Sequence, residues 1–583
     1  MPVSLRRREP DQALTLPEHL HPLLQRIYRQ RAIASAEQLQ LGFEYMLSPD
    51  RLKGIHTAVD LLWRALQQQQ KILVVSDFDA DGATSCALVI SVLHSVGFAE
   101  LDYIVPNRFD YGYGLTPEIV ELASARKPDL IITVDNGISS IDGVDSAASA
   151  GIEVLITDHH LPAKQLPAAA AIVNPNQPGC NFPSKSIAGV GVIFYLMLAL
   201  RSRLREENWF ASQGIAEPNL ADYLDLVALG TVADVVSLDR NNRILVNEGL
   251  KRIRAGRARP GIAALLKVAK RQPHRITAAD LGFALGPRLN AAGRLDDMST
   301  GIECLLANDE NSAYQLALEL DTMNRDRQQI EAEMRAQAFQ ALDSLALDPD
   351  RIPAALCLFD ERWHQGVVGI LASRVKDMYH RPTIAFALAN GEGSDELKGS
   401  ARSIKGLHIR DVLDSVAAHH PGLLSKFGGH AMAAGLSLSR QNFQDFAAAF
   451  EQEVAGLLDE EQLQASLYSD GEVEPHWFNL ETAQQLQGAG PWGQDFPEPV
   501  FDGHFVLRQQ RRVGERHLKM VLSPATDPAL QLDAIAFSVP DEEWPPGDAG
   551  FIDIAYRMDI NEYRGRQTLQ LMVERVLSWS SSA

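Results

Sequence analysis

The chain has 583 residues, of which 46% are hydrophobic and 22% are charged, and 54 Lys and Arg against 75 Asp and Glu give a formal net charge of −21. This composition is typical of a globular protein and excludes a disordered one. The acidic balance disfavours a protein that coats nucleic acid without specificity, because phosphate binding depends on positive charge. An acidic protein can still bind nucleic acid through a local basic groove. At about 150 residues per domain, the length predicts three or four domains.

The spacing of the cysteines and the length of the apolar runs indicate the cellular compartment. Cys86, Cys180, Cys304 and Cys357 are widely spaced and include no C-x-x-C pair, so we expect neither a disulfide framework nor a zinc site of that kind. The N-terminal segment has no apolar signal-peptide core. No apolar run reaches the 18 residues that a membrane span needs. We therefore expect a cytoplasmic protein with no membrane partner.

The first half of the chain predicts a polar lead-in followed by an α/β domain. Residues 1–55 are the lead-in, partly helical. The expected helices are Ala58–Gln70 and Ala83–Val96, and the expected strands are Ile72–Val75, Leu130–Val134 and Glu153–Thr157. Near-continuous apolar strands that alternate with helices predict a parallel sheet. Such sheets bind ligands at the carboxyl ends of their strands.

The second half predicts three further parts. Residues 310–345 contain no Gly or Pro and predict one long connector helix. A second α/β section follows over 352–455, with strands at Ala354–Phe359 and Thr383–Ala387. The acidic stretch 459–475 predicts a linker or domain edge. The remaining residues contain short alternating segments, Leu518–Leu522, Leu532–Phe537 and Thr568–Val573, which predict a small β-barrel.

The strongest chemical signal follows the first strand, where Asp77, Asp79 and Asp81 occupy alternate positions. An extended segment would place all three on one side, about 6–7 Å apart. Three like charges are costly there unless a cation neutralises them. A solvated turn or a helix-capping Asp would be the alternative for any one of them. A calcium loop is disfavoured because no Glu stands at the twelfth position.

Three other segments carry possible ligands. Asp135 follows the second strand, Asp158-His159-His160 follows the third, and Asp234 ends the apolar run 222–236. Each alone could be structural. Imidazole with carboxylates suits Mn²⁺, and carboxylates alone suit Mg²⁺. Together with the first cluster, these residues suffice to bind two metal ions. Two metal ions about 3.5–4 Å apart can catalyse the hydrolysis of a phosphoester.

These segments resemble the four N-terminal motifs of the DHH phosphoesterase superfamily. Gly428–Gly435, which reads GGHAMAAG, resembles the signature of the C-terminal domain associated with it. Three stretches are similar more narrowly to the RecJ family of single-strand-specific 5′→3′ exonucleases: Gly286–Leu295, Trp363–Ile370 and Gly399–Ser403. The resemblance covers about residues 55–580.

The resemblance implies a fold of two parallel-sheet α/β domains, joined by a long helix, plus a C-terminal OB-type β-barrel. The α/β domains would be of the DHH and DHHA1-like types. The expected divisions are a lead-in (1–55), a DHH catalytic domain with a helical insertion (56–305), the connector helix (306–350), a DHHA1-like substrate-binding domain (351–458) and an OB-like single-strand-binding domain (459–583).

The resemblance also implies two divalent cations, Mg²⁺ or Mn²⁺. Asp79 and Asp135 would hold one ion. Asp81, Asp135, His159 and Asp234 would hold the other, so that Asp135 bridges both.

Two residues would act beside the metals. His160 would face the scissile phosphate and stabilise charge in the transition state, and Asp158 would orient a histidine. Many small members of the superfamily carry a His where this chain has Val75, and Asp77 is the candidate that would replace it as a ligand.

Phosphate contacts are implied for Arg108, Arg288 and Ser373, with a surface ion pair as the alternative for each Arg. Gly428, Gly429 and His430 would offer backbone N–H groups to a phosphate, or form a tight turn before a helix of small residues. Basic segments at 248–260 and 507–523 favour a local nucleic-acid track. Candidate stacking residues are Phe109, Tyr111, Tyr113, Trp363, Trp492 and Phe496.

The expected function is metal-dependent degradation of single-stranded DNA, 5′→3′, to 5′-mononucleotides in recombination and repair, by attack of a metal-activated water. The resemblance implies single-strand-binding protein and a RecQ-type helicase as partners, and we expect a monomer. The alternatives are a DHH phosphodiesterase for nanoRNA or cyclic dinucleotides, disfavoured by the chain's length, and a non-catalytic DNA-binding scaffold, disfavoured because every ligand is present.

Overall fold

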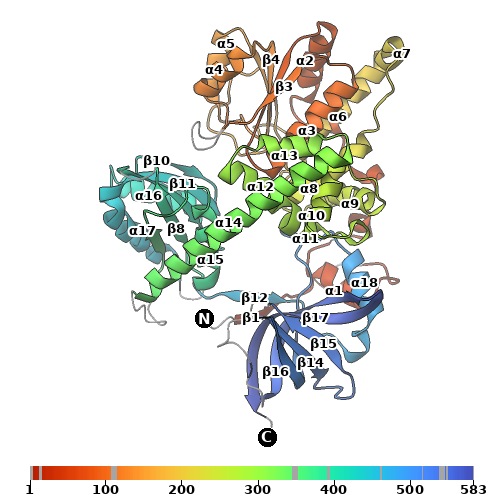
Figure 1. The fold of residues 1–583 in the computed structure, drawn as a ribbon, viewed down its shortest axis with the longest axis vertical. Coiled ribbons are helices and arrows are strands. Elements are labelled where there is room, and N and C mark those ends of the chain that lie inside the picture. The colour runs from red at the N-terminus through yellow and green to blue at the C-terminus, as the bar shows by residue number, and fades with distance from the viewer. Residues whose placement is uncertain are drawn as a thin grey trace. The chain divides into compact units, whose positions relative to one another are not determined.

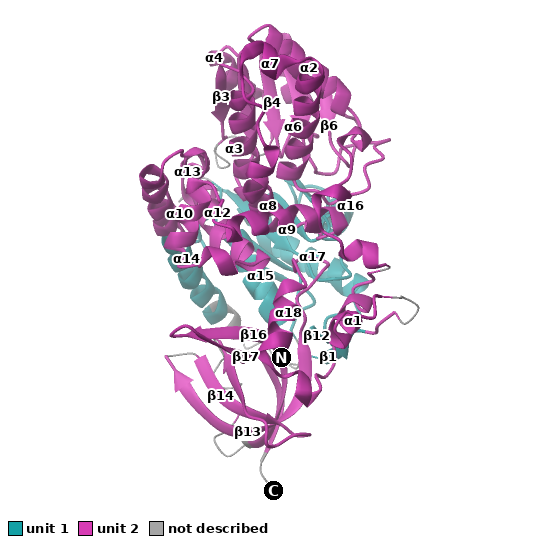
Figure 2. Cartoon of the chain, turned by 90° about the vertical axis from the view of Figure 1, so that its right-hand side faces the viewer, with its two compact units in different colours: residues 1–8, 325–469 teal, residues 9–324, 470–583 magenta. Residues whose placement is uncertain are grey.

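The fold is that of a computed structural model (Figure 1). It describes residues 4–11, 16–33, 35–106, 114–344, 352–389, 394–459, 462–514, 517–537, 545 and 549–581. The chain divides into two compact units, residues 1–8 with 325–469 and residues 9–324 with 470–583 (Figure 2). The division falls within the long helix α14 (Glu310–Ser344), which confirms the predicted connector helix.

The larger unit contains a five-stranded parallel sheet with the order β3-β2-β4-β5-β6. Its strands are β2 (Ile72–Ser76), β3 (Leu101–Ile104), β4 (Leu130–Val134), β5 (Glu153–Thr157) and β6 (Ala171–Val173). Every residue of β2 and β4 is buried, as expected for strands covered on both faces. The predicted strands and their parallel pairing are confirmed.

Helices cover the sheet and continue into a helical region. α3 (Ala80–Ser95) packs against α6 (Gly189–Glu206) and α8 (Leu224–Ala233), and most of its side chains are buried. The other helices of this unit are α1 (Pro22–Arg29), α2 (Ile55–Gln67), α4 (Pro117–Ala125), α5 (Ile141–Ser149), α7 (Trp209–Gln213), α9 (Arg240–Arg254), α10 (Pro260–Val268), α11 (Ala278–Asp280), η6 (a π-helix, Leu281–Leu285), α12 (Gly286–Leu295), α13 (Ser299–Leu306) and α18 (Leu480–Gly488).

The C-terminal part of this unit is a closed barrel with the order β13-β14-β15-β17-β16, which confirms the predicted β-barrel. Its strands are β13 (Phe501–Val513), β14 (His517–Pro524), β15 (Leu532–Ala536), β16 (Ala549–Tyr563) and β17 (Arg566–Ser581). Closure pairs β13 with both β14 and β16 and so leaves no long open edge.

The acidic stretch 459–475, predicted as a linker or domain edge, contains the boundary between the two units at residues 469 and 470. It contains β12 (Ser466–Ser469), which pairs in parallel with β1 (Ser4–Arg7). Asp470 forms a fully buried ion pair with Arg31, whose two terminal nitrogens lie 2.6 and 3.0 Å from the carboxylate oxygens. One of the carboxylates of this acidic stretch is therefore neutralised inside the protein.

The smaller unit has a five-stranded sheet with the order β10-β11-β9-β8-β7. Its elements are β7 (Leu356–Phe359), β8 (Thr383–Leu388), β9 (Glu396–Arg402), β10 (Lys426–Gly429), β11 (Ala433–Ser439), α15 (Val368–Tyr379), α16 (Ile409–His419) and α17 (Phe443–Leu457). The α/β class is confirmed, but only β7 and β8 pair in parallel. The connections from β8 to β9 and from β10 to β11 are short, and a parallel pair needs a crossover of a dozen residues or more. Within the described residues, no helix combines the length and apolar character needed to cross a bilayer.

Candidate metal centre

Asp79 lies at the point where the chain turns from β2 into α3. Its Oδ1 accepts hydrogen bonds from the backbone N–H groups of Asp81 and Gly82, at 2.9 and 3.0 Å. The prediction of three carboxylates along an extended segment is therefore wrong in geometry, because this cap starts the helix at Ala80 and places Asp81 in its first turn. Asp79 caps the helix with one carboxylate oxygen, which leaves the other oxygen to bind a metal ion.

Asp81 is buried and held by a second helix. Its Oδ2 and Oδ1 accept hydrogen bonds from the backbone N–H groups of Gly189 and Val190, at 2.7 and 3.0 Å, in the first turn of α6. Burial, followed by the negative charge of Asp79, raises the pKa of Asp81 to about 7. The two N–H groups at the N-terminus of α6 stabilise the charged form of Asp81, but they do not outweigh burial and the charge of Asp79.

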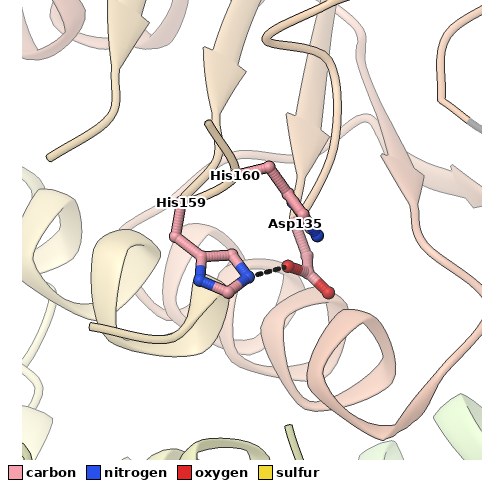
Figure 3. Close-up of side chains that lie close together, drawn as sticks. All are labelled: Asp135, His159 and His160. Atoms are coloured by element: carbon pink, nitrogen blue, oxygen red, sulfur yellow. Dashed lines mark ion pairs between the residues drawn. The ribbon is translucent and has the colours of Figure 1, made fainter. Parts of the chain in front are cut away.

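Asp135, His159 and Asp234 converge from three different loops. Asp135 Oδ1 lies 3.1 Å from His159 Nε2 (Figure 3). Asp234 Oδ2 lies 3.5 Å from the same nitrogen. Burial, and then the charge of Asp81, raise the pKa values of Asp135 and Asp234 well above the ordinary range. Such a concentration of buried carboxylates is unfavourable without a compensating cation.

The candidate ligands form three overlapping groups whose donor atoms lie within 4.8 Å of one another. The groups are Asp77 with Asp79 and Asp135, Asp81 with His159 and Asp234, and Asp135 with His159 and His160. The structure thus brings together every metal ligand predicted from the sequence, including Asp77, and Asp135 joins two groups. The pattern suits two divalent cations that share one carboxylate.

The donor set fits such ions. Asp234 Oδ2 is buried and accepts no hydrogen bond from the described residues, although a buried carboxylate oxygen ordinarily has a donor. Oxygen ligands with one imidazole match Mn²⁺ or Mg²⁺ better than a sulfur-preferring metal.

Asp158 organises the loop that carries both histidines. Its Oδ1 lies 2.7 Å from His160 Nδ1 and accepts the backbone N–H groups of His159 and His160, at 2.7 and 3.0 Å. Its Oδ2 accepts the N–H of Ile138 at 2.9 Å. Burial alone would lower the pKa of His160, but the hydrogen bond and charge of Asp158 outweigh it and raise this pKa to about 9. The imidazole is therefore held in place and readily protonated.

Helix α12, which lies in the segment Gly286–Leu295, contacts the first aspartate loop directly. Asn290 Oδ1 accepts the backbone N–H of Ala80 at 2.8 Å. A Cβ at Gly293 would lie 1.9 Å from the Phe78 carbonyl oxygen, so only glycine permits this approach. These contacts were not predicted, and they show that α12 supports the metal loop.

The predicted phosphate contacts lie in several places. Arg288 is paired with Asp321 of α14, with Nη2 and Nε at 2.7 and 2.9 Å from Oδ1. Ser373 is half-buried on α15 in the smaller unit. Arg108 lies outside the described residues.

The glycine pair Gly428 and Gly429 ends β10, and His430 donates its backbone N–H to the Ala433 carbonyl at 2.8 Å. The turn predicted as one alternative is present, but the helix predicted after it is wrong. The small residues form strand β11, because they pair with β9 and β10. Gly429 has φ +147°, and a Cβ there would lie 2.5 Å from the Ala433 oxygen.

The predicted stacking residues that the structure describes are buried or stacked on other side chains. Trp363 is buried, and Trp492 and Phe496 stack on each other with centroids 5.0 Å apart. The remaining candidates, Phe109, Tyr111 and Tyr113, lie outside the described part of the chain. Among the described residues, the exposed aromatic side chains are elsewhere, at Phe43, Tyr45, Phe283, Tyr468, Phe537, Phe551, Tyr563 and Trp579. Which face of a strand or helix meets solvent depends on packing, so no local pattern distinguished them.

Comparison with known proteins gives the family. Residues 71–231 match the N-terminal domain of the DHH family, residues 352–456 match the DHHA1 domain, and residues 469–575 match the RecJ OB domain. The single-stranded-DNA-specific exonuclease RecJ of Escherichia coli is 54% identical over 574 residues, which cover 98% of this chain and 99% of that protein. The chain belongs to the RecJ family. The Bacillus subtilis RecJ is 33% identical over 582 residues and covers 98% of this chain and 70% of its own length.

Solved structures of the RecJ family agree with this assignment. The crystal structure of Thermus thermophilus RecJ in complex with Mn²⁺ has a TM-score of 0.77 at 30% identity, with 96% of this chain and 76% of that chain covered. The Mg²⁺ complex of the same protein has a TM-score of 0.71 at 28% identity, with coverage of 97% and 75%. The RecJ family is one of exonucleases, so this chain is a hydrolytic enzyme.

Proposed function

We propose that this protein degrades single-stranded DNA from the 5′ end to 5′-mononucleotides and acts in recombination and repair. The observation that carries the proposal is the convergence of Asp81, Asp135, His159 and Asp234 at the carboxyl ends of the parallel strands. The family's substrate, as its members are named, supports the choice of single-stranded DNA.

The residues that would hold two divalent cations, Mg²⁺ or Mn²⁺, divide between two sites. Asp79 and Asp135, with Asp77 as a further candidate, would hold one ion. Asp81, Asp135, His159 and Asp234 would hold the other. When bound, such a pair makes water a better nucleophile at neutral pH and offsets charge on the leaving oxygen.

His160 and Asp158 would complete the site. A protonated His160, oriented by Asp158 through the 2.7 Å contact, would donate a hydrogen bond to the scissile phosphate. Asp158 would thus act through His160, not on the substrate.

Other residues would bind the rest of the strand. Arg288 has five N–H donors, and those not directed at Asp321 or the Ala284 carbonyl could contact a phosphate. Arg108 and Ser373 would contact the 5′ end. The backbone at Gly428, Gly429 and His430 would approach a phosphate, and the barrel would bind the strand by charge and stacking.

The cellular setting extends the same proposal. The enzyme would work in the cytoplasm as a monomer. Its partners would be single-strand-binding protein, which covers the substrate, and a RecQ-type helicase, which would supply single strands from duplex DNA.

The test is digestion of a long 5′-phosphorylated single strand, labelled at either end, in Mg²⁺ and in Mn²⁺, with duplex as control. We expect early release of the 5′-terminal mononucleotide, little duplex cleavage, and no cleavage by folded Asp81→Ala or His159→Ala variants. Full activity of the metal-supplemented Asp81→Ala variant would contradict the site. A dinucleotide cleaved faster than the long strand would instead favour a small-substrate phosphodiesterase.

A further inference from the structure

A cavity of about 780 Å³ lies within the larger unit, between its helical region and the barrel with the segment before it. One wall carries Val235 and Phe283, and the other carries Trp492 and Arg557. Direct bonds fix the two walls to each other. Arg275 forms an ion pair with Glu562 at 2.9 Å and donates to the Ile560 carbonyl of β16 at 3.2 Å. The cavity has the volume of a ligand site.

Phe283 is the most exposed large apolar side chain among the described residues, with 86% of its surface accessible. It lies in the π-helix η6, where the Gly286 N–H reaches back to the Leu281 carbonyl. Pro287, the next residue, has no N–H to donate to the carbonyl of Phe283, as a residue four positions later would in a regular α-helix. In such a helix the proline ring would also clash with that carbonyl. The wider turn accommodates this proline, and such turns are frequent at functional sites.

Val235 brings the lining of the cavity to within one residue of a candidate metal ligand. It directly follows the candidate ligand Asp234, is 64% exposed, and has φ +61°. A β-branched residue rarely adopts this left-handed conformation, which costs about 1–3 kcal/mol and persists mainly at functional sites. One exposed apolar side chain thus stands a single residue from the metal centre, and it lines the same cavity as Phe283.

The charges around the cavity indicate what it binds. Arg271 pairs with Asp280 at 3.1 Å, Arg275 pairs with Glu562, and Arg557 pairs with Glu498. Lys270 is exposed and forms no ion pair within the described residues. Arg254 also lines the cavity and donates to the Ile276 carbonyl. Three of the five basic side chains in the lining are thus paired with carboxylates, so the cavity is suited to the apolar faces and edges of nucleobases, with phosphates at its rim.

We propose that this cavity receives unpaired bases of the strand next to the metal centre, with one base stacked on Phe283 and another against Val235. The inference rests on the proposed function and assigns it a base-binding site. A base stacked on Phe283 has left its neighbours in the strand, and a duplex cannot present its bases this way without unstacking. The contact would therefore favour single strands over duplex without selecting a sequence.

The test measures binding of 5′-phosphorylated single strands that carry one abasic position, moved stepwise from the 5′ end. Dissociation constants are measured by fluorescence anisotropy in an Asp81→Ala background, so that the strand stays intact. With Phe283 present, we expect one or two positions near the 5′ end at which loss of the base weakens binding about 5- to 100-fold. Phe283→Ala should weaken binding of the intact strand by a similar factor and abolish that position dependence. Phe283→Trp should restore both.

Phe43→Ala is the matched control, because Phe43 is also an exposed phenylalanine, at 37%, but does not line the cavity. It should leave strand binding and its position dependence unchanged. The inference is overturned if Phe283→Ala binds every strand as the parent does, which is also the result expected of a cavity that serves a protein partner. Failure of the proposed function is a separate outcome, since the enzyme with Asp81 intact would then not cleave the strand at all.

Discussion

Asp158 Oδ1 lies 2.7 Å from His160 Nδ1 and also accepts the backbone N–H groups of His159 and His160. One buried carboxylate oxygen thereby sets the ring orientation of His160 and the course of the loop that carries both histidines. The contact also favours the protonated imidazole.

Asp158 and His160 should therefore act as one unit in catalysis. His160→Gln should lower the single-turnover rate about 10²–10³-fold, as does loss of one charge-stabilising donor. Asp158→Asn should lower it through misorientation of the same ring. The double variant should be little slower than the slower single variant, because the two changes remove one interaction. Fully additive losses would show that Asp158 acts independently of His160.

The stability of the metal-free protein should fall as the pH rises. Burial, and then the charge of Asp79, raise the pKa of Asp81 from 3.8 to about 7. Between pH 3.8 and about pH 7, Asp81 keeps its proton in the folded state and has lost it in the unfolded state. The stabilisation that this proton gives the folded state therefore decreases as the pH rises, and it is lost above about pH 7. The pKa of His160 is raised from 6.5 to about 9, so its contribution to stability also decreases as the pH rises through this range. Thermal unfolding in EDTA from pH 5 to 9 measures it.

Added Mn²⁺ should oppose that trend, because the ion binds the charged carboxylates of the folded state. Saturation at 100 times the dissociation constant stabilises by about 2.7 kcal/mol. We expect the melting temperature to rise more with Mn²⁺ at pH 8 than at pH 5.5. Asp81→Asn should flatten the pH dependence in EDTA. An equal Mn²⁺ effect at both pH values would contradict the carboxylate site.

Gly189→Ala should weaken metal binding while the protein stays folded. A Cβ at Gly189 would lie 2.6 Å from Asp135 Oδ1 and 2.7 Å from Asp135 Cβ, so the side chain that joins two ligand groups must move. Calorimetric titration with Mn²⁺ should show affinity lower by at least about tenfold. Gly456→Ala, on helix α17 with open space around it, is the control. It should leave metal binding unchanged and stabilise slightly, by about 0.4–1 kcal/mol.

The Arg288–Asp321 pair should be important for stability. The side chains are 16% and 5% exposed, so Asp321→Asn leaves a largely buried guanidinium without its carboxylate. We expect a loss of about 3 kcal/mol in the free energy of unfolding, measured in urea. Asp102→Asn is the comparison, because Asp102 pairs with Arg126 at exposures of 39% and 44%. That change should cost less than about 1 kcal/mol.

Local patterns were sufficient for much of the fold. β4 and β5 have the predicted bounds, since each run of mostly apolar and β-branched residues ends just before an aspartate. Helix α14 covers residues 310–344 of the predicted connector helix, where no Gly or Pro interrupts it. Of the five strands of the smaller unit, β7 and β8 were predicted, but β9, β10, β11 and the mixed pairing were not. That pairing depends on which strands meet, and their own sequences do not contain this information.

The sequence by itself determined which residues could form the metal centre and which chemistry they could support. Carboxylates and a histidine pair, each just after an apolar run, specify a cation site because parallel strands bring their ends together. The motifs also specified the family.

Only the tertiary structure decided how those residues are held. Asp79 caps a helix, α6 donates to Asp81, Asn290 fixes the loop at Ala80, and Arg288 is paired with Asp321. It also decided that Trp492 stacks on Phe496 while Phe283 is exposed, although both line one cavity. The physical reason is that exposure and many of these hydrogen bonds depend on residues far away in the sequence, such as Gly189 for Asp81. The net charge of −21 likewise acquires meaning only in space, because several of those acids surround a cation site and others, such as Asp470, neutralise buried arginines.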